Sequence, residues 1–373
     1  MGFGVYIHWP FCLSKCPYCD FYKEVRKNVP QDEIIAGYKR ELDFYYQYTS
    51  DKVVSSVFFG GGTPSLIKPE NIAALIDYIS GKWKTTPDVE ISLEANPNSD
   101  YPQMFADLRH AGINRLSLGV QALNEADLRF LGRTHNLAQA YQAIDEVLQN
   151  FDNHSLDLIY ARPQQKLSEW EKELEHAAAF GLKHLSLYQL TIEEGTVFAR
   201  KGIKALEDEA AGEMYLFTED YLSAKGIYKY EVSNYVRPGY ASRHNLLYWT
   251  GQDYIGIGPS AHGRFCFSGF KGNLEQKLQD RKIYYASTYN CQLEELSRTE
   301  RAEELLLMGL RLTDGIDKRR FKACCGLDFD GFVNQERLKY LCSAGLLVDT
   351  PEKLKATREG FLVLNELIGQ LCP

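Results

Sequence analysis

Along the first two-thirds of the chain, the pattern of hydrophobic and polar positions alternates repeatedly between one typical of strands and one typical of helices. Short apolar or β-branched runs predict strands, and longer stretches with apolar positions three and four residues apart predict helices. Strand–helix alternation of this kind predicts parallel βαβ units. Six units fit a partial (β/α)6 barrel, an α/β fold, better than a complete eightfold barrel. The predicted strands cover residues 5–8, 55–59, 89–94, 114–121, 155–160 and 184–190, and the predicted helices cover 32–48, 69–79, 101–111, 137–148 and 167–180.

The pattern changes after about residue 230. Residues 231–263 are rich in Tyr, Gly, Asn and Arg and predict irregular structure. Two amphipathic helices, a short strand pair and a final helix capped by Thr357 then follow, which is typical of a winged-helix-like domain. The helices are expected at 301–312, 332–344 and 359–367, and the strands at 346–349 and 355–357.

We therefore expect three parts in this chain. A core barrel should cover residues 1–230, and an irregular connecting segment should cover 231–295. The smaller, helical C-terminal domain should cover 296–373. A length of 373 residues is enough for one large domain and a small one.

Composition narrows the class of protein. The net charge of −8 argues against a nucleic-acid partner, because such proteins usually carry a basic footprint. The N-terminus lacks the basic and apolar regions of a signal peptide, and no apolar run reaches the ~18 residues of a membrane span. Nine cysteines, an odd number, indicate a reducing compartment. We expect a cytoplasmic protein.

Chemically useful polar residues gather at the ends of the predicted strands. Active sites of α/β barrels lie at the C-terminal ends of their strands, so these residues are expected to share one site. They are the cysteine-containing loop, residues 60–64, Glu94, Asn96, Gln121, Asp157, Tyr160, Tyr188 and Gln189.

The loop after the first predicted strand places Cys12, Cys16 and Cys19 within eight residues. Iron–sulfur clusters are held by cysteine thiolates, usually four. Three local ligands would leave one iron with an open position, which a small molecule with an amine and a carboxylate could chelate. The cysteines therefore predict a [4Fe–4S] cluster that binds such a ligand.

Spacing alone leaves two other interpretations of this loop open. With His8 as a fourth ligand, the three cysteines could form a Cys3His zinc site. Cys16 and Cys19 also form a C-x-x-C pair, which is typical of redox proteins. His8 falls within a predicted strand, so a packed core histidine is the alternative to a ligand.

The cysteine spacing, with an aromatic residue before the last cysteine, resembles the radical-SAM superfamily, whose cluster binds and cleaves S-adenosylmethionine (SAM). Further segments resemble its HemN/HemW branch in the same order, over nearly the whole chain. They are residues 6–12 (YIHWPFC), 59–64 (FGGGTP), 118–121 (LGVQ), 131–135 (LGRTH), 157–160 (DLIY), 233–239 (SNYVRPG) and 307–311 (LMGLR).

Two features separate the subgroups of this branch. Coproporphyrinogen III dehydrogenases of the HemN type carry another cysteine two positions after the third, whereas here Asp20 and Phe21 follow Cys19. Those enzymes also have a substantial segment before the first strand, which here starts almost at Met1. Residues 244–249 (HNLLYW) resemble the HNxxYW motif of the HemW family. The resemblance implies a heme chaperone that passes heme to acceptor proteins, with membrane-associated proteins among the candidates.

Site roles follow from this resemblance at matching positions. Cys12, Cys16 and Cys19 would hold the cluster, and His244 and His262 are candidate heme ligands because imidazole commonly ligates heme iron. The alternative for each histidine is a structural role. Residues lining one or two SAM sites would be Tyr6, Tyr18, Gly61, Gly62, Thr63, Glu94, Gln121, Arg133 and Asp157.

The chain departs from the family pattern after its fifth predicted strand. Residues 161–165 read Ala-Arg-Pro-Gln-Gln, where the family typically has Gly-Leu-Pro-x-Gln. A left-handed conformation would cost Ala161 or Arg162 about 1–2 kcal/mol. Ala122 and Leu123 also replace the more usual Ser-Phe.

Two other functions remain as alternatives to a heme chaperone. One is SAM-dependent oxidative decarboxylation of coproporphyrinogen III, which the shared scaffold favours. The other is a zinc-stabilised binding module that uses the C-terminal domain. For the oligomeric state we expect a monomer or a cluster-dependent homodimer.

Overall fold

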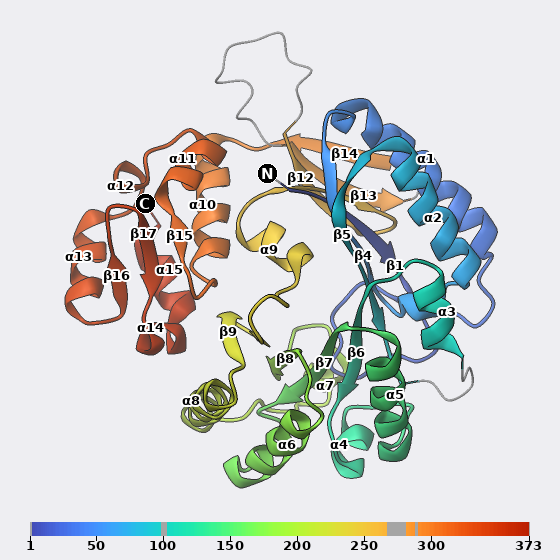
Figure 1. Cartoon of the computed structure of the whole chain (residues 1–373). Coiled ribbons are helices and arrows are strands. Elements are labelled where there is room, and N and C mark those ends of the chain that lie inside the picture. The colour runs from blue at the N-terminus through green and yellow to red at the C-terminus, as the bar shows by residue number, and fades with distance from the viewer. Residues whose placement is uncertain (1, 98–102, 267–280, 288–289, 373) are drawn as a thin grey trace.

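The computed structural model describes residues 2–97, 103–266, 281–287 and 290–372. One curved, open sheet of twelve strands forms the core, in the order β14-β13-β12-β11-β1-β4-β5-β6-β7-β8-β10-β9. The strands from β11 to β8 are parallel, and antiparallel strands flank them at both ends. The predicted partial barrel is confirmed as an α/β fold with an open parallel sheet (Figure 1).

The six predicted strands are six of the seven parallel strands of this sheet, and β11 is the seventh. Because each leads through a helix to its neighbour, all six end at the same edge of the sheet. They are β1 (Phe3–Trp9), β4 (Val53–Gly61), β5 (Lys84–Ala95), β6 (Arg115–Gln121), β7 (Asn153–Tyr160) and β8 (His184–Gln189).

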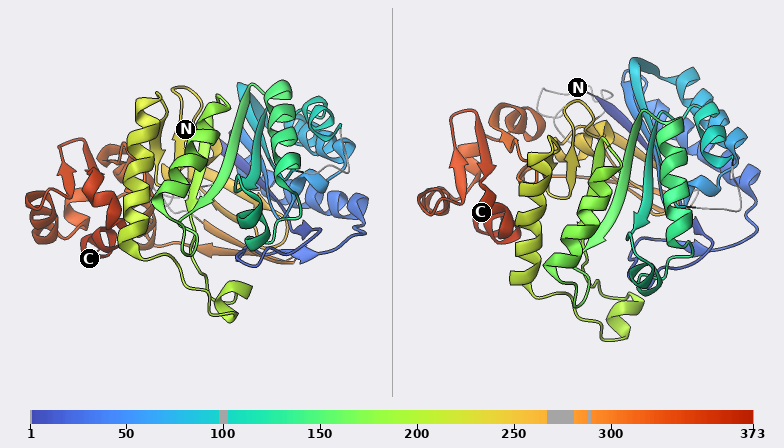
Figure 2. Two further views of the ribbon diagram at one scale, coloured as in Figure 1. Left: turned by 90° about the horizontal axis from the view of Figure 1, so that it is seen from below. Right: turned by 60° about the horizontal axis from the view of Figure 1, so that its bottom comes forward.

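Helices cover the convex face of the sheet, as Figures 1 and 2 show. On β1, Phe3, Val5, Ile7 and Trp9 are buried in the core between sheet and helices, and the residues between them face the concave side. The covering and connecting helices are α1 (Gln31–Thr49), η1 (Pro64–Leu66), α2 (Pro69–Lys82), α3 (Met104–His110), α4 (Glu125–Phe130), α5 (Leu137–Asn150), α6 (Leu167–Ala179), α7 (Val197–Arg200) and α8 (Asp208–Ala224).

The prediction of irregular structure at 231–263 is wrong. This segment contains a helix, α9, on the concave side of the sheet (Figure 1). Its strands are short and its apolar positions few, so neither period stands out in the sequence. Its elements are the end of β9 (Tyr228–Glu231), β10 (Asn234–Val236), α9 (Arg243–Trp249), β11 (Asp253–Ile257) and the first residues of β12 (His262–Phe265); β13 (Arg281–Ser287) and β14 (Asn290–Glu295) follow.

The C-terminal part combines helices with a three-stranded sheet, β15-β17-β16. The predicted strand pair and the Thr357 cap are confirmed, because Thr357 Oγ1 accepts a hydrogen bond from Gly360 N. The final helix is divided at Val363 instead of continuous. The elements are α10 (Arg298–Gly309), β15 (Ile316–Asp317), α11 (Lys318–Cys325), α12 (Phe329–Phe332), α13 (Gln335–Ser343), β16 (Leu347–Asp349), β17 (Lys353–Ala356), α14 (Arg358–Leu362) and α15 (Leu364–Leu371).

This C-terminal part packs on the far edge of the core sheet. Thr313 N donates to Tyr230 O at 3.0 Å, and the Lys229 ammonium lies 4.0 Å from the centre of the Phe361 ring. Arg358 pairs with Asp220 of α8 at 2.7 Å. Among the described residues, no helix combines the length and apolar character needed to cross a membrane.

Other predicted boundaries shift by a few residues. β5 begins at Lys84, five residues before the predicted strand, and the helix predicted at 101–111 is described only from Met104. Residues 101 and 102 lie outside the described part. The sequence prediction did not include α8, although it is one of the long helices of the core.

Candidate functional site

One cavity of about 690 Å³ lies where the six parallel strands end. It collects side chains from the cysteine loop and from the ends of β4 to β8. Most residues predicted for the cluster and for SAM line it, although they are far apart in the chain: Cys12, Cys16, Tyr18, Cys19, Gly61, Gly62, Thr63, Glu94, Gln121, Arg133 and Asp157.

The cysteine loop forms one wall of this cavity. Cys12 is buried at the end of β2 (Phe11–Cys12), which pairs with β3 (Glu24–Val25), and Cys16 and Cys19 are partly exposed. Thr63 Oγ1 lies 3.5 Å from Cys12 Sγ and donates to it. Burial and the two neighbouring cysteines raise the pKa of the Cys12 thiol. Burial thus disfavours a free thiolate at Cys12, and a bound cationic centre would favour it.

The glycine turn after β4 fits closely against the cysteine loop. Gly62 N donates to Trp9 O at 2.7 Å, and Thr63 N donates to Phe11 O at 3.0 Å. A Cβ atom at position 62 would lie 2.8–2.9 Å from backbone atoms of Trp9, Pro10 and Phe11. Only glycine permits this approach of the two backbones, so the turn fixes the position of the loop.

Arg133 connects the cysteine loop to the next strands. Its Nη1 lies 3.4 Å from both Cys16 Sγ and the Tyr18 hydroxyl, and its Nη2 donates to Gly119 O at 2.9 Å and to Asn96 Oδ1. The Nε atom is buried without a hydrogen-bond partner. A guanidinium in contact with a cysteine sulfur suits a negatively charged group at this position.

Two carboxyl groups lie deep in the same cavity. Glu94 Oε2 accepts a hydrogen bond from Gly61 N at 3.2 Å, and burial together with the nearby Asp157 raises the pKa of Glu94 to about 8. Asp157 accepts hydrogen bonds from Ser117 and Ser155, yet burial still raises its pKa. A cationic ligand would compensate the cost of ionising both groups, as a sulfonium or an ammonium would.

Gln121 ends β6 in a conformation that is rare for a residue with a side chain. Its φ is 75°, and the pairing of β6 with β7 shifts its register between Gly119 and Gln121. Backbone strain of this kind costs about 1–3 kcal/mol and concentrates at functional sites. This conformation occurs at the end of β6, where Gln121 lines the cavity.

Four predicted site residues do not line the cavity: Tyr6, Tyr160, His244 and His262. Tyr160 is buried, and its ring stacks on Trp170. Tyr6 lies deeper, and its hydroxyl is 3.0 Å from His8 Nδ1, while His8 Nε2 is 3.1 Å from Tyr22 O. Both nitrogens of His8 are therefore occupied, which matches the alternative of a packed core histidine. His262 is exposed at the start of β12.

His244 lies on α9, inside the curve of the sheet. Its Nδ1 is 2.7 Å from Ser56 Oγ, its Nε2 is 2.6 Å from the Tyr248 hydroxyl, and its ring stacks on Phe58. Burial lowers the pKa of His244 to about 3. Gly4 permits this packing, since a Cβ there would lie 2.6 Å from Leu247. The geometry supports the structural alternative for His244.

Several cavity residues were not predicted as SAM contacts. Gly119 and Gly132 leave space for neighbouring side chains. A Cβ at position 119 would approach Gln121 to 2.8 Å, and a Cβ at position 132 would approach Pro17 to 2.6 Å. Asn96 accepts from Arg133, and its place at the end of a strand was the available signal. Isolated glycines carry no such signal, because turns account for most of them.

The residues present fit the expected cofactors. Three thiols come from the cysteine loop, a guanidinium with a free donor lies beside Cys16, and of the two carboxyls Glu94 accepts a hydrogen bond from the close glycine turn. This donor set suits an iron–sulfur cluster together with a ligand that carries both a carboxylate and a cation. Among the described residues, no three His, Cys, Asp or Glu side chains are arranged around a point to hold a single metal ion.

Comparison with known proteins adds a second line of evidence. The Radical SAM superfamily matches residues 6–177, and the HemN C-terminal domain matches residues 296–363. "Radical S-adenosyl methionine domain-containing protein 1, mitochondrial" from Mus musculus is 35% identical, covering 99% of this chain and 87% of its own length. "Heme chaperone HemW" from Escherichia coli is 34% identical, covering 98% of this chain and 97% of its own length.

Among solved structures, the fold resembles that of coproporphyrinogen III oxidase (HemN) from Escherichia coli, a radical SAM enzyme. The TM-score is 0.78 at 20% identity, and the match covers 99% of this chain and 89% of that one. At this identity the likeness establishes the fold alone.

Proposed function

This chain belongs to the HemW family of the radical-SAM superfamily, and from that premise we propose that it is a heme chaperone. It binds heme and passes it to acceptor proteins, while a [4Fe–4S] cluster and SAM occupy the cavity at the strand ends. The observation that carries this proposal is the similarity to HemW proteins over 98% of the chain.

In this proposal each part of the cavity has one task. Cys12, Cys16 and Cys19 hold the cluster, which supplies an iron with an open coordination position when bound. Arg133 attracts the carboxylate of SAM beside the cluster, and Glu94 and Asp157 receive its cationic groups and ribose hydroxyls. The close glycine turn keeps the cysteine loop in place and excludes water from its inner side.

The iron ligand of heme is the least supported part of the proposal. Ligation by His244 would require two buried hydrogen bonds to break, and each carries a cost of about 1–3 kcal/mol for the group left unpaired. His262 is exposed, so it is the more accessible of the two predicted ligands. We therefore favour His262 as the ligand.

The test is a heme titration of anaerobically reconstituted protein, followed by visible absorption. The proposal predicts a Soret band that saturates at about one heme per chain and an altered band in His262→Ala. His176→Ala, on the exposed face of α6, serves as the control and should bind as the unchanged protein does. Absence of any Soret change on titration contradicts the proposal.

An anaerobic assay with SAM and a reductant separates this proposal from its alternative. Formation of protoporphyrinogen together with 5′-deoxyadenosine would favour the coproporphyrinogen III dehydrogenase instead. The predicted partners also belong to the proposal: heme acceptors, including membrane-associated ones, with a cytoplasmic location and a monomer or a cluster-dependent homodimer. The domain boundaries predicted near residues 230 and 296 are also part of the proposal.

A further inference from the structure

His135 differs from the other buried histidines of the described chain. Each of the others uses both ring nitrogens in polar contacts: His8, His154, His184 and His244. In His135, Nε2 lies 3.2 Å from Val120 O, whereas Nδ1 is buried and has no hydrogen-bond partner. An unpaired buried nitrogen costs free energy, so this exception indicates a partner that the protein itself does not supply.

His135 lines the cavity at the strand ends and is only 6% exposed. It follows Arg133, which contacts the cysteine loop, by two positions. The hydrogen bond to Val120 O anchors its ring to the end of β6. A ligand in this cavity is therefore the partner within reach of the ring.

The hydrogen bond to Val120 decides where the ring carries its proton. A carbonyl oxygen can only accept, so Nε2 donates, and a neutral ring then has a lone pair at Nδ1. Burial and the nearby Arg133 guanidinium lower the pKa of His135 to about 4, so the ring is neutral at physiological pH. Nδ1 therefore accepts a hydrogen bond. The same guanidinium disfavours a second cation nearby, so the donor should be an uncharged N–H or O–H group.

We propose that Nδ1 of His135 accepts a hydrogen bond from the amino group of the adenine of SAM. The inference rests on the proposed function, in which SAM occupies this cavity. That function already assigns the carboxylate of SAM to Arg133, and its cationic groups and ribose hydroxyls to Glu94 and Asp157. The amino group of adenine is the remaining donor, and it is uncharged.

Apolar side chains on the next strands suit the ring of the same base. Ile159 on β7 and Leu190 after β8 line the cavity, and both belong to one buried hydrophobic cluster. Leu190 N donates to Tyr160 O at 2.9 Å, which holds the two segments together. Because β6, β7 and β8 are neighbours in the sheet, these residues and His135 lie along one part of its edge. A purine needs apolar contacts for its faces and a polar contact at its rim.

The test compares SAM with an analogue in which purine replaces adenine, so that only the amino group is missing. Calorimetric titration of anaerobically reconstituted protein measures both affinities. The unchanged protein should bind the analogue roughly 3–10-fold more weakly than SAM, which is the effect of one neutral hydrogen bond. In His135→Phe, which keeps a flat ring and removes both nitrogens, the two ligands should bind equally. His135→Leu gives the same comparison with a smaller side chain.

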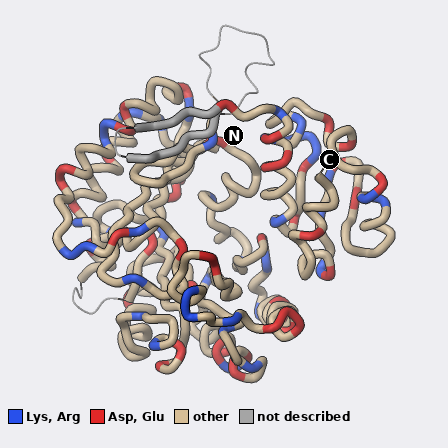
Figure 3. The backbone as a smooth tube through the Cα atoms, turned by 180° about the vertical axis from the view of Figure 1, so that it is seen from behind, with Lys and Arg blue, Asp and Glu red and all other residues tan. Residues whose placement is uncertain are grey.

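Two controls separate this contact from a general effect of the substitution. His154→Phe replaces a buried histidine whose nitrogens are both paired, and it should keep the full difference between the two ligands. A 2′-deoxy analogue of SAM should lose the same factor in the unchanged protein and in His135→Phe. Charges of both signs are interspersed along the chain (Figure 3), and replacing a neutral ring leaves their long-range effect on a cationic ligand unchanged.

The inference is overturned if His135→Phe distinguishes SAM from the purine analogue as the unchanged protein does, or if the unchanged protein does not distinguish them. Coupling of His135 to the 2′-hydroxyl instead of the amino group also overturns it. Each of these outcomes leaves the proposed function intact. An unchanged protein that binds neither SAM nor the analogue after cluster loading contradicts the proposed function itself.

Discussion

Two turns at the same edge of the sheet are held in their conformations by different means. The turn after β4 uses glycine: Gly61 has a φ of 109°, and Gly62 leaves room for the cysteine loop. The turn after β7 contains no glycine, although Ala161 has a φ of 55° and Gln164 a φ of 64°. Left-handed backbone at such residues is unfavourable, so the second turn requires compensation.

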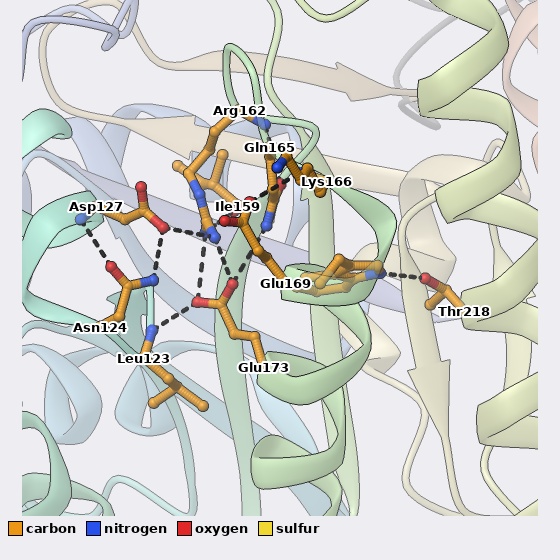
Figure 4. A network of polar contacts seen from close by, with 11 residues as sticks. Leu123, Asn124, Asp127, Ile159, Arg162, Gln165, Lys166, Glu169, Glu173 and Thr218 are labelled. Carbon is orange, nitrogen blue, oxygen red and sulfur yellow. Dashed lines mark hydrogen bonds and ion pairs between the residues drawn. The ribbon is translucent and has the colours of Figure 1, made fainter.

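A buried polar network provides that compensation (Figure 4). Arg162 is only 2% exposed; its Nη2 pairs with Asp127 at 2.8 Å and with Glu173, and its Nη1 donates to Ile159 O at 2.7 Å. Glu173 also accepts from Leu123 N at 2.6 Å. The network thereby joins the second turn to α4 and α6, and α4 leads directly to Arg133. One turn is fixed by the absence of side chains and the other by paired charges.

The largest effect is expected where the paired charges are broken. Glu173→Leu leaves Arg162 with Asp127 as its one remaining acidic partner, and loss of a partner from a buried ion pair costs about 3–5 kcal/mol of unfolding free energy. Urea denaturation measures this loss. The double variant Arg162→Leu/Glu173→Leu removes both charges and should recover most of it. A cost below about 1 kcal/mol for Glu173→Leu would show that the network does not hold the second turn.

The glycine turn should be sensitive to a single methyl group. Gly62→Ala places a Cβ against three backbone atoms, and we expect a loss of about 1–3 kcal/mol and incomplete cluster loading after reconstitution. Gly81→Ala is the control, because nothing lies within 4 Å of a Cβ at that position of α2. Iron analysis checks the loading. Equal iron content in both variants would refute the proposed fit of turn and loop.

A change of pH should affect the two turns differently, because Glu94 contacts only the first turn, the one after β4. Its pKa of about 8 lies above that of the unfolded chain, so its protonated form stabilises the ligand-free protein at low pH. This stabilisation is lost as the pH rises through about 8. A cationic ligand favours the ionised form, so SAM affinity should rise up to tenfold per pH unit below 8. Calorimetric titration from pH 6.5 to 8.5 should show this slope, and Glu94→Gln should lack it.

The smallest effect is relief of strain at the second turn. Ala161→Gly removes the unfavourable left-handed alanine and should stabilise the protein by up to about 1 kcal/mol, less the extra entropy of an unfolded glycine. Ala138→Gly in α5 should destabilise it, since glycine is unfavourable in a helix. Thermal unfolding of the two variants gives the comparison. Destabilisation by both would mean that the network already relieves the strain at Ala161.

The sequence allowed prediction of the parts that follow from periodicity and local spacing. The six parallel strands and the gathering of polar residues at their ends follow from the alternation of strand and helix. The Ala161–Arg162 departure was visible in the sequence, and so was its strain. Its compensation was not, because Arg162, Asp127 and Glu173 come from three separate elements. For the same reason, the hydrogen bonds that occupy both nitrogens of His244 could not be foreseen.

The central claim is that Cys12, Cys16 and Cys19 hold a [4Fe–4S] cluster to which SAM binds. Metal and sulfide analysis of anaerobically reconstituted protein, with electron paramagnetic resonance of the reduced sample, tests it most directly. The account predicts about four irons and four sulfides per chain and a resonance that changes when SAM is added. Zinc without iron or acid-labile sulfide would contradict it.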